Sequence, residues 1–260
     1  MRAIFFIAWL MASINAFTAF GYDAAVLFAL KEDQVDFAAV QPMSAQPLSV
    51  GSQQFFPFMT GGGRFIAGAT RAGLVETMDT VVSACARLNA KRLISFGLAG
   101  VLTDRYEAGD VVIVRYAGRH DRGNWSGSGE FQPRNTALAE VPADDLLNRV
   151  AEAFVAKCRE KGLRVHDGGR LVSGDAFITS DMYRAKLARD FEADLVDMNT
   201  GAFAVAMDSF RRPGLLIRVV SDRADARASE DFAAFVGDRA RTLKPAATAL
   251  AEALRELERE

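Results

Sequence analysis

The chain has 260 residues, 50% of them hydrophobic and 25% charged, a composition typical of a folded globular protein and not of a disordered one. Lys and Arg total 31 against 33 Asp and Glu, so a formal net charge of −2 offers no basic surface to a nucleic acid. The two cysteines and two histidines, Cys85, Cys158, His120 and His166, lack the paired spacing of a zinc site. We therefore expect no structural metal and no nucleic-acid partner.

Residues 1–19 are typical of a secretory signal peptide. Arg2 precedes an uncharged, largely apolar run from Ala3 to Phe20 with small residues near Ala19, which predicts cleavage near Ala19 and a periplasmic or secreted protein without a membrane anchor. Two alternatives stay open: an uncleaved anchor, because the run is just long enough to span a bilayer, and a mis-chosen start codon ahead of a cytoplasmic protein. Export would permit a disulfide between the two cysteines, but their positions in amphipathic helical patterns favour buried thiols.

Strand and helix patterns alternate along the rest of the chain. Short apolar runs predict strands at 24–29, 53–59, 64–70, 92–97, 110–114, 169–173 and 215–220, with a glycine turn at 60–63 that suits a hairpin. The polar run at 31–33 predicts a helix start, and helical patterns predict helices at 74–88, 146–161, 182–190, 199–210 and 230–260, the last interrupted before Pro245. The stretch 120–134 is rich in Gly, Ser and charge, which predicts a mobile loop.

This alternation, without a linker or an internal repeat, predicts one α/β domain over residues 20–260. We expect a mixed, mostly parallel central sheet flanked by helices. Binding sites in such sheets lie at the carboxyl ends of strands, which directs attention to four segments: the residues after Ala29, then 97–100, 173–178 and 221–225.

Two of these segments carry side chains that could take part in catalysis or ligand binding. Asp222 follows the last strand, where burial would raise the pKa of its carboxyl and suit it to donate a proton. Capping of the following helix by Asp222 or Asp225 is the equal alternative. Phe177 follows the strand that ends at Ser173, and it can either lie flat against a planar ligand or pack in the core.

Taken in chain order, these segments resemble the nucleoside phosphorylase/hydrolase superfamily, and most closely the 5′-methylthioadenosine/S-adenosylhomocysteine nucleosidases, over nearly the whole mature chain. The similar segments are the acidic first loop, the glycine-rich segment, the central strand, the base-binding loop, the ribose-binding segment and the catalytic aspartate motif. In this sequence they are Ala29-Leu30-Lys31-Glu32-Asp33, Phe96-Gly97-Leu98-Ala99-Gly100, Gly109-Asp110-Val111-Val112, Ser173-Gly174-Asp175-Ala176-Phe177-Ile178, Val196-Asp197-Met198-Asn199 and Ser221-Asp222-Arg223-Ala224-Asp225.

The resemblance implies hydrolysis of the N-ribosidic bond of a purine nucleoside without a cofactor. Phe177 would stack on the purine, the backbone of Ile178 would bind its Watson–Crick edge, and Asp222 would protonate N7 so that the base leaves as a neutral molecule. Further substrate contacts fall on Ala99, Gly100, Met198, Asn199 and Ser221.

Asp33 aligns with the carboxylate that orients the attacking water in this family, and Glu32 is the alternative if the first loop shifts by one residue. An acid at this place disfavours phosphate as the nucleophile, because like charges would be brought together. Members that use phosphate commonly carry an arginine before the glycine-rich segment, and this chain has Ser95-Phe96 there. Water is therefore the expected nucleophile.

Three features depart from the family pattern. Asn199 replaces the usual ribose-binding Glu and offers one acceptor oxygen in place of a carboxylate, although it would also serve as an N-cap for the following helix. Leu98 stands where a small polar residue is common, which makes the site more apolar. The third departure is the leader, because the methionine-recycling nucleosidases work in the cytoplasm.

Three functions follow as hypotheses. A purine nucleosidase is favoured by Asp33 and Asp222, a non-catalytic secreted purine-binding or storage-type relative is favoured by Leu98 and Asn199, and a purine nucleoside phosphorylase is the weakest. The expected partners are a small purine nucleoside and, from the family likeness and the apolar run 54–59, a second copy of the chain. The family likeness also gives His120 and Asp121 a role in gating or at the dimer edge, with an exposed loop pair as the alternative.

Overall fold

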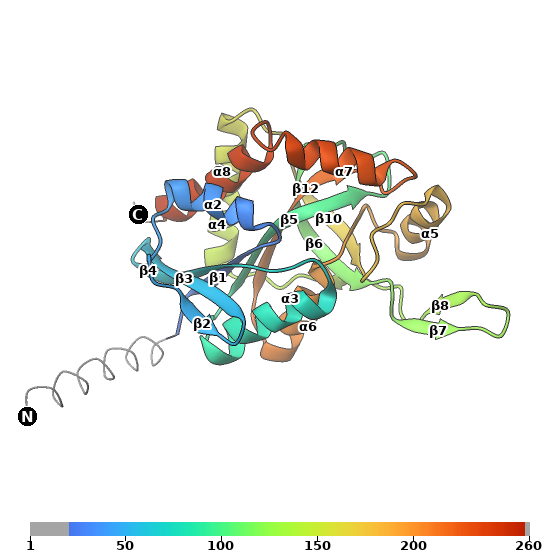
Figure 1. Ribbon diagram of the computed structural model, residues 1–260, viewed down its shortest axis with the longest axis horizontal. Helices are drawn as coiled ribbons and strands as arrows, with labels where there is room; N and C mark the ends of the chain where they lie inside the picture. Colours follow the sequence, from blue (N-terminus) through green and yellow to red (C-terminus); the bar gives the residue numbers. More distant parts are fainter. Residues whose placement is uncertain (1–20, 258–260) are drawn as a thin grey trace, which may run out of the picture.

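The structure is a computed structural model that describes residues 21–257, so the predicted leader at residues 1–19 lies outside the described part of the chain. Strands and helices alternate in the predicted order (Figure 1). The strands are β1 (Ala24–Phe28), β2 (Leu48–Val50), β3 (Gln53–Thr60), β4 (Gly63–Ala69), β5 (Leu93–Val101), β6 (Val111–Arg119), β7 (Gly123–Trp125), β8 (Phe131–Pro133), β9 (Ala139–Glu140), β10 (Val165–Ser173), β11 (Leu195–Asp197) and β12 (Gly214–Asp222). The helices are α2 (Lys31–Val40), α3 (Leu74–Val82), which continues as the π-helical turn η1 (Ser83–Arg87), α4 (Asp145–Glu160), α5 (Asp181–Phe191), α6 (Thr200–Phe210), α7 (Ala228–Gly237) and α8 (Leu243–Glu256).

One mixed sheet of ten strands organises the domain, as the sequence predicted. Its order is β11-β10-β6-β12-β5-β1-β4-β3-β2, with β9 paired to β6. The pairs β1–β4, β1–β5, β12–β5, β10–β6 and β10–β11 are parallel, whereas β12 runs antiparallel to β6. Because β11 also pairs with β5, five strands close into a ring at one end of the sheet.

Two helical layers cover the sheet (Figure 1). Phe37 of α2, Phe154 of α4 and Leu250 of α8 are fully buried together against one face. Val81 of α3 and Phe203 of α6 are buried against the other. The amphipathic patterns of α3, α4 and α8 fix which side of each of these helices meets the sheet, whereas α2 buries the polar Asp33 and Gln34 beside Phe37.

The predicted mobile loop at 120–134 is wrong in part. Residues 123–125 and 131–133 pair as an antiparallel hairpin, β7–β8, which projects from the body of the domain (Figure 1). The rings of Trp125 and Phe131 pack edge to face across it at 5.4 Å, and the backbone N–H of Ser126 donates to the Glu130 carbonyl in the turn. Two aromatic residues on either side of a Gly- and Ser-rich turn are the sequence signal for this hairpin.

Two smaller expectations are also settled. The predicted interruption before Pro245 is confirmed, because the C-terminal helical region divides into α7 and α8. Cys85 and Cys158 are free, buried thiols in different core clusters, and burial raises their pKa values to about 11 and about 12. Between residues 21 and 257, no helix is both long and apolar enough to cross a bilayer.

Candidate active site

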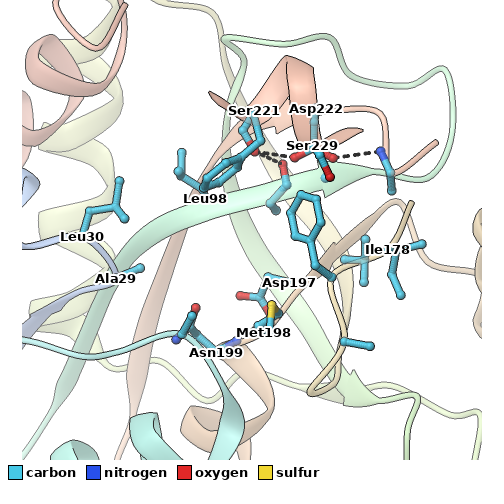
Figure 2. A pocket seen from close by; sticks show the side chains of 18 residues that line it. Ala29, Leu30, Leu98, Ile178, Asp197, Met198, Asn199, Ser221, Asp222 and Ser229 are labelled. Carbon is cyan, nitrogen blue, oxygen red and sulfur yellow. Dashed lines mark hydrogen bonds between the residues drawn. The ribbon is translucent and has the colours of Figure 1, made fainter. Parts of the chain in front are cut away.

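A cavity of about 410 Å³ lies where the predicted strand-end segments meet, within the size range of small-molecule sites. All four segments contribute to its wall, and β11 and α7 complete it (Figure 2). The lining residues are Ala29, Leu30, Ala72, Leu98, Ala99, Gly100, Ala176, Phe177, Ile178, Val196, Asp197, Met198, Asn199, Ser221, Asp222, Ala224, Ser229 and Phe232. Every predicted site residue is among them except Asp33.

Asp222 is held in the wall by a local irregularity of β12. The pairing of β12 with β5 shifts register between Val220 and Asp222, a bulge that lets both Ser221 and Asp222 line the cavity. The Asp222 carboxylate accepts from the Ser221 hydroxyl at 2.7 Å and from the Ala224 backbone N–H at 2.9 Å. A side chain at Gly100 would collide with this carboxylate, because an added Cβ would lie 2.7 Å from its Oδ1 atom.

The environment of Asp222 suits proton donation. Its side chain is 3% exposed, and burial raises its pKa above the ordinary 3.8 although the hydrogen bonds from Ser221 and Ala224 act in the opposite direction. Capping of α7 by Asp222 is excluded, because its carboxylate bonds to Ala224, four residues before the helix begins. Asp225 accepts from the Arg227 N–H instead, outside the cavity.

An aromatic pair forms one side of the cavity. Phe177 is 43% exposed, so the alternative that it packs in the core is wrong. Its ring meets that of Phe232 from α7 at 5.6 Å, nearly edge to face, and the buried Ile178 continues the same wall. Phe232 and Ser229 were not predicted from the sequence, because Phe232 lies within the predicted helix 230–260 and Ser229 lies just before its start.

A buried ion pair supports the opposite side of the cavity. Arg218 of β12 is fully buried, and its Nε donates to the Asp197 carboxylate at 2.8 Å. The same guanidinium donates to the hydroxyls of Ser95 and Thr200 at 3.0 and 2.7 Å. Sequence reasoning passed over Arg218, yet a lone cation within an apolar strand was a visible signal, because a buried charge requires a partner.

Both oxygens of the Asp197 carboxylate accept hydrogen bonds from groups of the protein itself. The carboxylate accepts from the backbone N–H groups of Asn199 and Thr200, from the Thr200 hydroxyl and from Arg218. These bonds cap the N-terminus of α6, so the predicted capping by the Asn199 side chain is wrong. The Asn199 amide nitrogen donates instead to the Arg71 carbonyl at 2.9 Å and to the Thr77 hydroxyl at 2.6 Å.

Asp33 is buried in α2 and does not line the cavity. Its carboxylate accepts from the Arg239 guanidinium at 2.8 Å, and Arg239 also donates to Asp36 at 2.7 Å. Burial raises the pKa of Asp33 to about 6, although the charge of Arg239 acts in the opposite direction. Glu32, the alternative acid, is exposed and is also outside the cavity wall.

His120 and Asp121 lie beneath the segment that carries Phe177. His120 is 2% exposed and packs against Gly174, so the alternative of an exposed loop pair is wrong for this residue. The Asp121 carboxylate accepts from the Asp175 N–H at 3.1 Å, and the Asp175 carboxylate accepts from the Leu74 N–H at 2.6 Å. A gating role for the pair stays a prediction.

The charges of the cavity wall are acidic only. Among the lining residues of the described chain there is no Lys, Arg or His, and Asp197 and Asp222 are the two acids. Between residues 21 and 257, no group of three or more His, Cys, Asp or Glu side chains is placed to hold a metal ion. The remaining wall is mostly apolar, with Met198 beside Asp197 and Leu30 beside Ala29 (Figure 2).

Solved structures of known enzymes share this fold. A 5′-methylthioadenosine/S-adenosylhomocysteine nucleosidase from Neisseria meningitidis, in complex with methylthio-immucillin-A, matches with a TM-score of 0.73 and 25% identity over 90% of this chain and 98% of its own. The futalosine hydrolase of Helicobacter pylori matches with a TM-score of 0.72 and 22% identity over 90% and 96% of the two chains. The Campylobacter jejuni 5′-methylthioadenosine/S-adenosylhomocysteine nucleosidase matches with a TM-score of 0.71 and 20% identity over 92% and 100%.

A family model described as the phosphorylase superfamily matches residues 24–256. The match begins at the first residue of β1 and ends at the last residue of α8, so it includes every strand and helix that builds the cavity. The chain therefore belongs to the phosphorylase superfamily.

Proposed function

We propose that this protein hydrolyses the N-ribosidic bond of a purine nucleoside of the 5′-methylthioadenosine or S-adenosylhomocysteine type. The observation that carries the proposal is Asp222, a buried carboxyl group with a raised pKa that faces a mostly apolar cavity. The solved nucleosidases that share the fold support the same reaction class.

Asp222 is the proposed general acid. A purine that lies against Phe177 and Ile178 brings a ring nitrogen within reach of the Asp222 carboxyl. Transfer of the carboxyl proton to N7 lets the C–N bond electrons leave with a neutral base, while positive charge develops on the sugar carbon and its ring oxygen. The Asp222 carboxylate formed in this step keeps the hydrogen bonds from Ser221 and Ala224.

Water is the proposed nucleophile. A phosphate ion would need a cation to balance its charge, whereas the described cavity wall presents only carboxylates as charged groups. Arg218 does not supply that cation, because Asp197, Ser95 and Thr200 occupy its donors behind the wall.

Asp33 stays a prediction as the group that orients the water. Its carboxylate is paired with Arg239, and one of its oxygens is buried without a hydrogen-bond partner. A catalytic role requires the side chain to leave Arg239 and turn toward the cavity when substrate binds. An Arg239→Gln variant, which weakens the ion pair, is then expected to keep or raise kcat.

The reaction is tested by incubating the purified protein with 5′-methylthioadenosine, adenosine and inosine, with and without phosphate, and measuring the free base and the sugar product. Hydrolysis predicts free base and free pentose at the same rate in both buffers. A pentose 1-phosphate formed only with phosphate would identify a phosphorylase. An absence of free base from all three nucleosides would contradict the proposal.

A second candidate is a non-catalytic purine-binding protein. The cavity wall carries Asn199 where a carboxylate is usual in the family, and Asp33 lies behind the wall, so the second acid of the hydrolytic mechanism is not at the cavity. Calorimetric binding of adenine or 5′-methylthioadenosine by protein that releases no base would support this candidate.

A further inference from the structure

The sugar end of the cavity is built around an amide. Met198 and Asn199 lie across the cavity from Asp222 (Figure 2), so a nucleoside whose purine is at Asp222 would direct its pentose toward them. The hydroxyls of Ser221 and Ser229 lie on the Asp222 side (Figure 2). Asp197 is adjacent to the pentose, but its carboxylate is saturated by α6 and by Arg218. The polar group left for the pentose on that side is the Asn199 side chain.

The neighbours of Asn199 determine which way its amide faces. The Thr77 hydroxyl donates its only hydrogen to the Arg71 carbonyl at 3.1 Å, so that hydroxyl can only accept from Asn199. The Arg71 carbonyl also only accepts. The NH₂ group of Asn199 must therefore face Arg71 and Thr77, and its Oδ1 atom is directed into the cavity (Figure 2).

These neighbours also select an amide over a carboxylate. The carboxylate of an aspartate at position 199, which has the same length as the asparagine, would set an anionic oxygen against the Arg71 carbonyl, with no hydrogen between the two oxygens. Asn199 is consequently a built feature of the site, supported by α3 and by the loop before it, and it presents one neutral acceptor to the sugar.

We infer that this site binds purine nucleosides with little dependence on the 2′-hydroxyl, so that 2′-deoxyribonucleosides are substrates within about tenfold of ribonucleosides. The inference rests on the proposed hydrolysis. The neutral Asn199 oxygen gives the 2′-hydroxyl no more than one uncharged hydrogen bond, and loss of one such bond typically changes affinity by about tenfold or less. A carboxylate that accepts from both hydroxyls would discriminate far more strongly, because charge-assisted hydrogen bonds are about twice as strong.

Binding to the wild-type protein tests the inference most directly. The probes are a carbon-linked adenosine analogue, which cannot be hydrolysed, and its 2′-deoxy counterpart, with both Kd values measured by calorimetry. We expect the two Kd values to differ by no more than about tenfold. A preference for the ribose form greater than tenfold overturns the inference.

Turnover and one variant complete the test. With 2′-deoxyadenosine as substrate, kcat/KM is expected to be at least about one tenth of the value for adenosine. In Asn199→Ala the two analogues should bind equally, because the amide acceptor for the sugar is removed, and a remaining ribose preference above tenfold would reveal another anchor and refute the inference. If neither nucleoside is hydrolysed, the proposed hydrolysis fails, and the Kd ratio still decides whether the 2′-hydroxyl is recognised.

Discussion

At the scale of single residues, the Arg218–Asp197 ion pair is the interaction with the greatest predicted effect on stability. Both side chains are almost fully buried, at 1% and 2% exposure, so neither charge is screened by water. Arg218→Met leaves the Asp197 carboxylate buried beside the cavity without its cation. We expect the free energy of unfolding to fall by about 3–5 kcal/mol, measured by urea denaturation.

Two controls separate the buried charge from lost packing. Arg223→Met removes an exposed arginine that lies close to Arg218 in the sequence and pairs with Asp104, and it should change stability by less than about 1 kcal/mol. The double variant Arg218→Met/Asp197→Asn removes both charges and should recover part of the loss. Equal urea midpoints for Arg218→Met and the wild type would rule out this account.

Asp222 has a distinct kinetic signature. Because a general acid acts only while protonated, kcat should fall as the pH rises through the raised pKa of Asp222. Asp222→Asn keeps the shape of the side chain but has no proton to transfer, so kcat should drop by ~10²–10⁴-fold while binding of the free base persists. Asp225→Asn, which changes a neighbouring acid outside the cavity, is the matched control, and undiminished turnover in Asp222→Asn would refute the mechanism.

At the scale of helices and loops, Arg239 joins α2 to the connection between α7 and α8. The pKa of Asp33 in the fold is about 6, above the ordinary 3.8, so the carboxylate binds its proton more tightly in the native state. The contribution of this pKa shift to the free energy of unfolding is fully present below pH 3.8 and is lost as the pH rises through about 6. The difference between these two pKa values corresponds to about 3 kcal/mol.

The pH dependence of the Asp33 contribution to stability is measured by comparison with Asp33→Asn, whose side chain cannot titrate. The unfolding free energy of the wild type relative to Asp33→Asn should decrease between pH 4 and pH 7, as followed by urea denaturation at a series of pH values. Glu32→Gln, which removes an exposed charge from the same helical turn, controls for the change in net charge. A difference that is constant with pH would show that Asp33 is not the titrating group.

The loop that carries Phe177 is tied to the start of α3 by Asp175. The Asp175 carboxylate accepts from the Leu74 N–H, a bond that α3 lacks from its own N-cap residue, Gly73. Asp175→Ala should lower the unfolding free energy by about 1 kcal/mol and raise KM with little change in kcat, because the aromatic wall loses its support. The control is Asp181→Ala, which removes an acid from the first turn of α5. An unchanged KM in Asp175→Ala would show that the hydrogen bond between Asp175 and Leu74 does not affect substrate binding.

The contrast between Asp222 and Asp33 shows what the sequence can predict. Asp222 was identified because its position depends on a local pattern, the apolar strand that ends beside it. The orientation of Asp33 depends on Arg239, 206 residues away, and no local pattern contains that contact. The same holds for the Asn199 amide, whose direction is fixed by Arg71 and Thr77, 128 and 122 residues away.

At the scale of the whole molecule, the predicted homodimer remains a prediction. Burial of Phe55 and Phe58 in β3 shows that the core explains part of the apolar run, while Met59 is 61% exposed. Val75 and Val205, at 72% and 42% exposure, are further apolar side chains on α3 and α6, which pack together on one face of the sheet. Light scattering at micromolar concentration should give twice the chain mass, and a monomeric mass would count against pairing.

The position of β12 in the sheet also constrains the order of folding. This strand is buried along its whole length and lies between β5 and β6, although roughly a hundred residues of chain separate it from them. During synthesis from the N-terminus, β5 and β6 therefore wait with unpaired edges until residue 222 has left the ribosome. The strand that delivers Asp222 is thus also the strand that pairs with β5 and β6, so the nascent chain places its proposed acid and covers these two strand edges in the same late step.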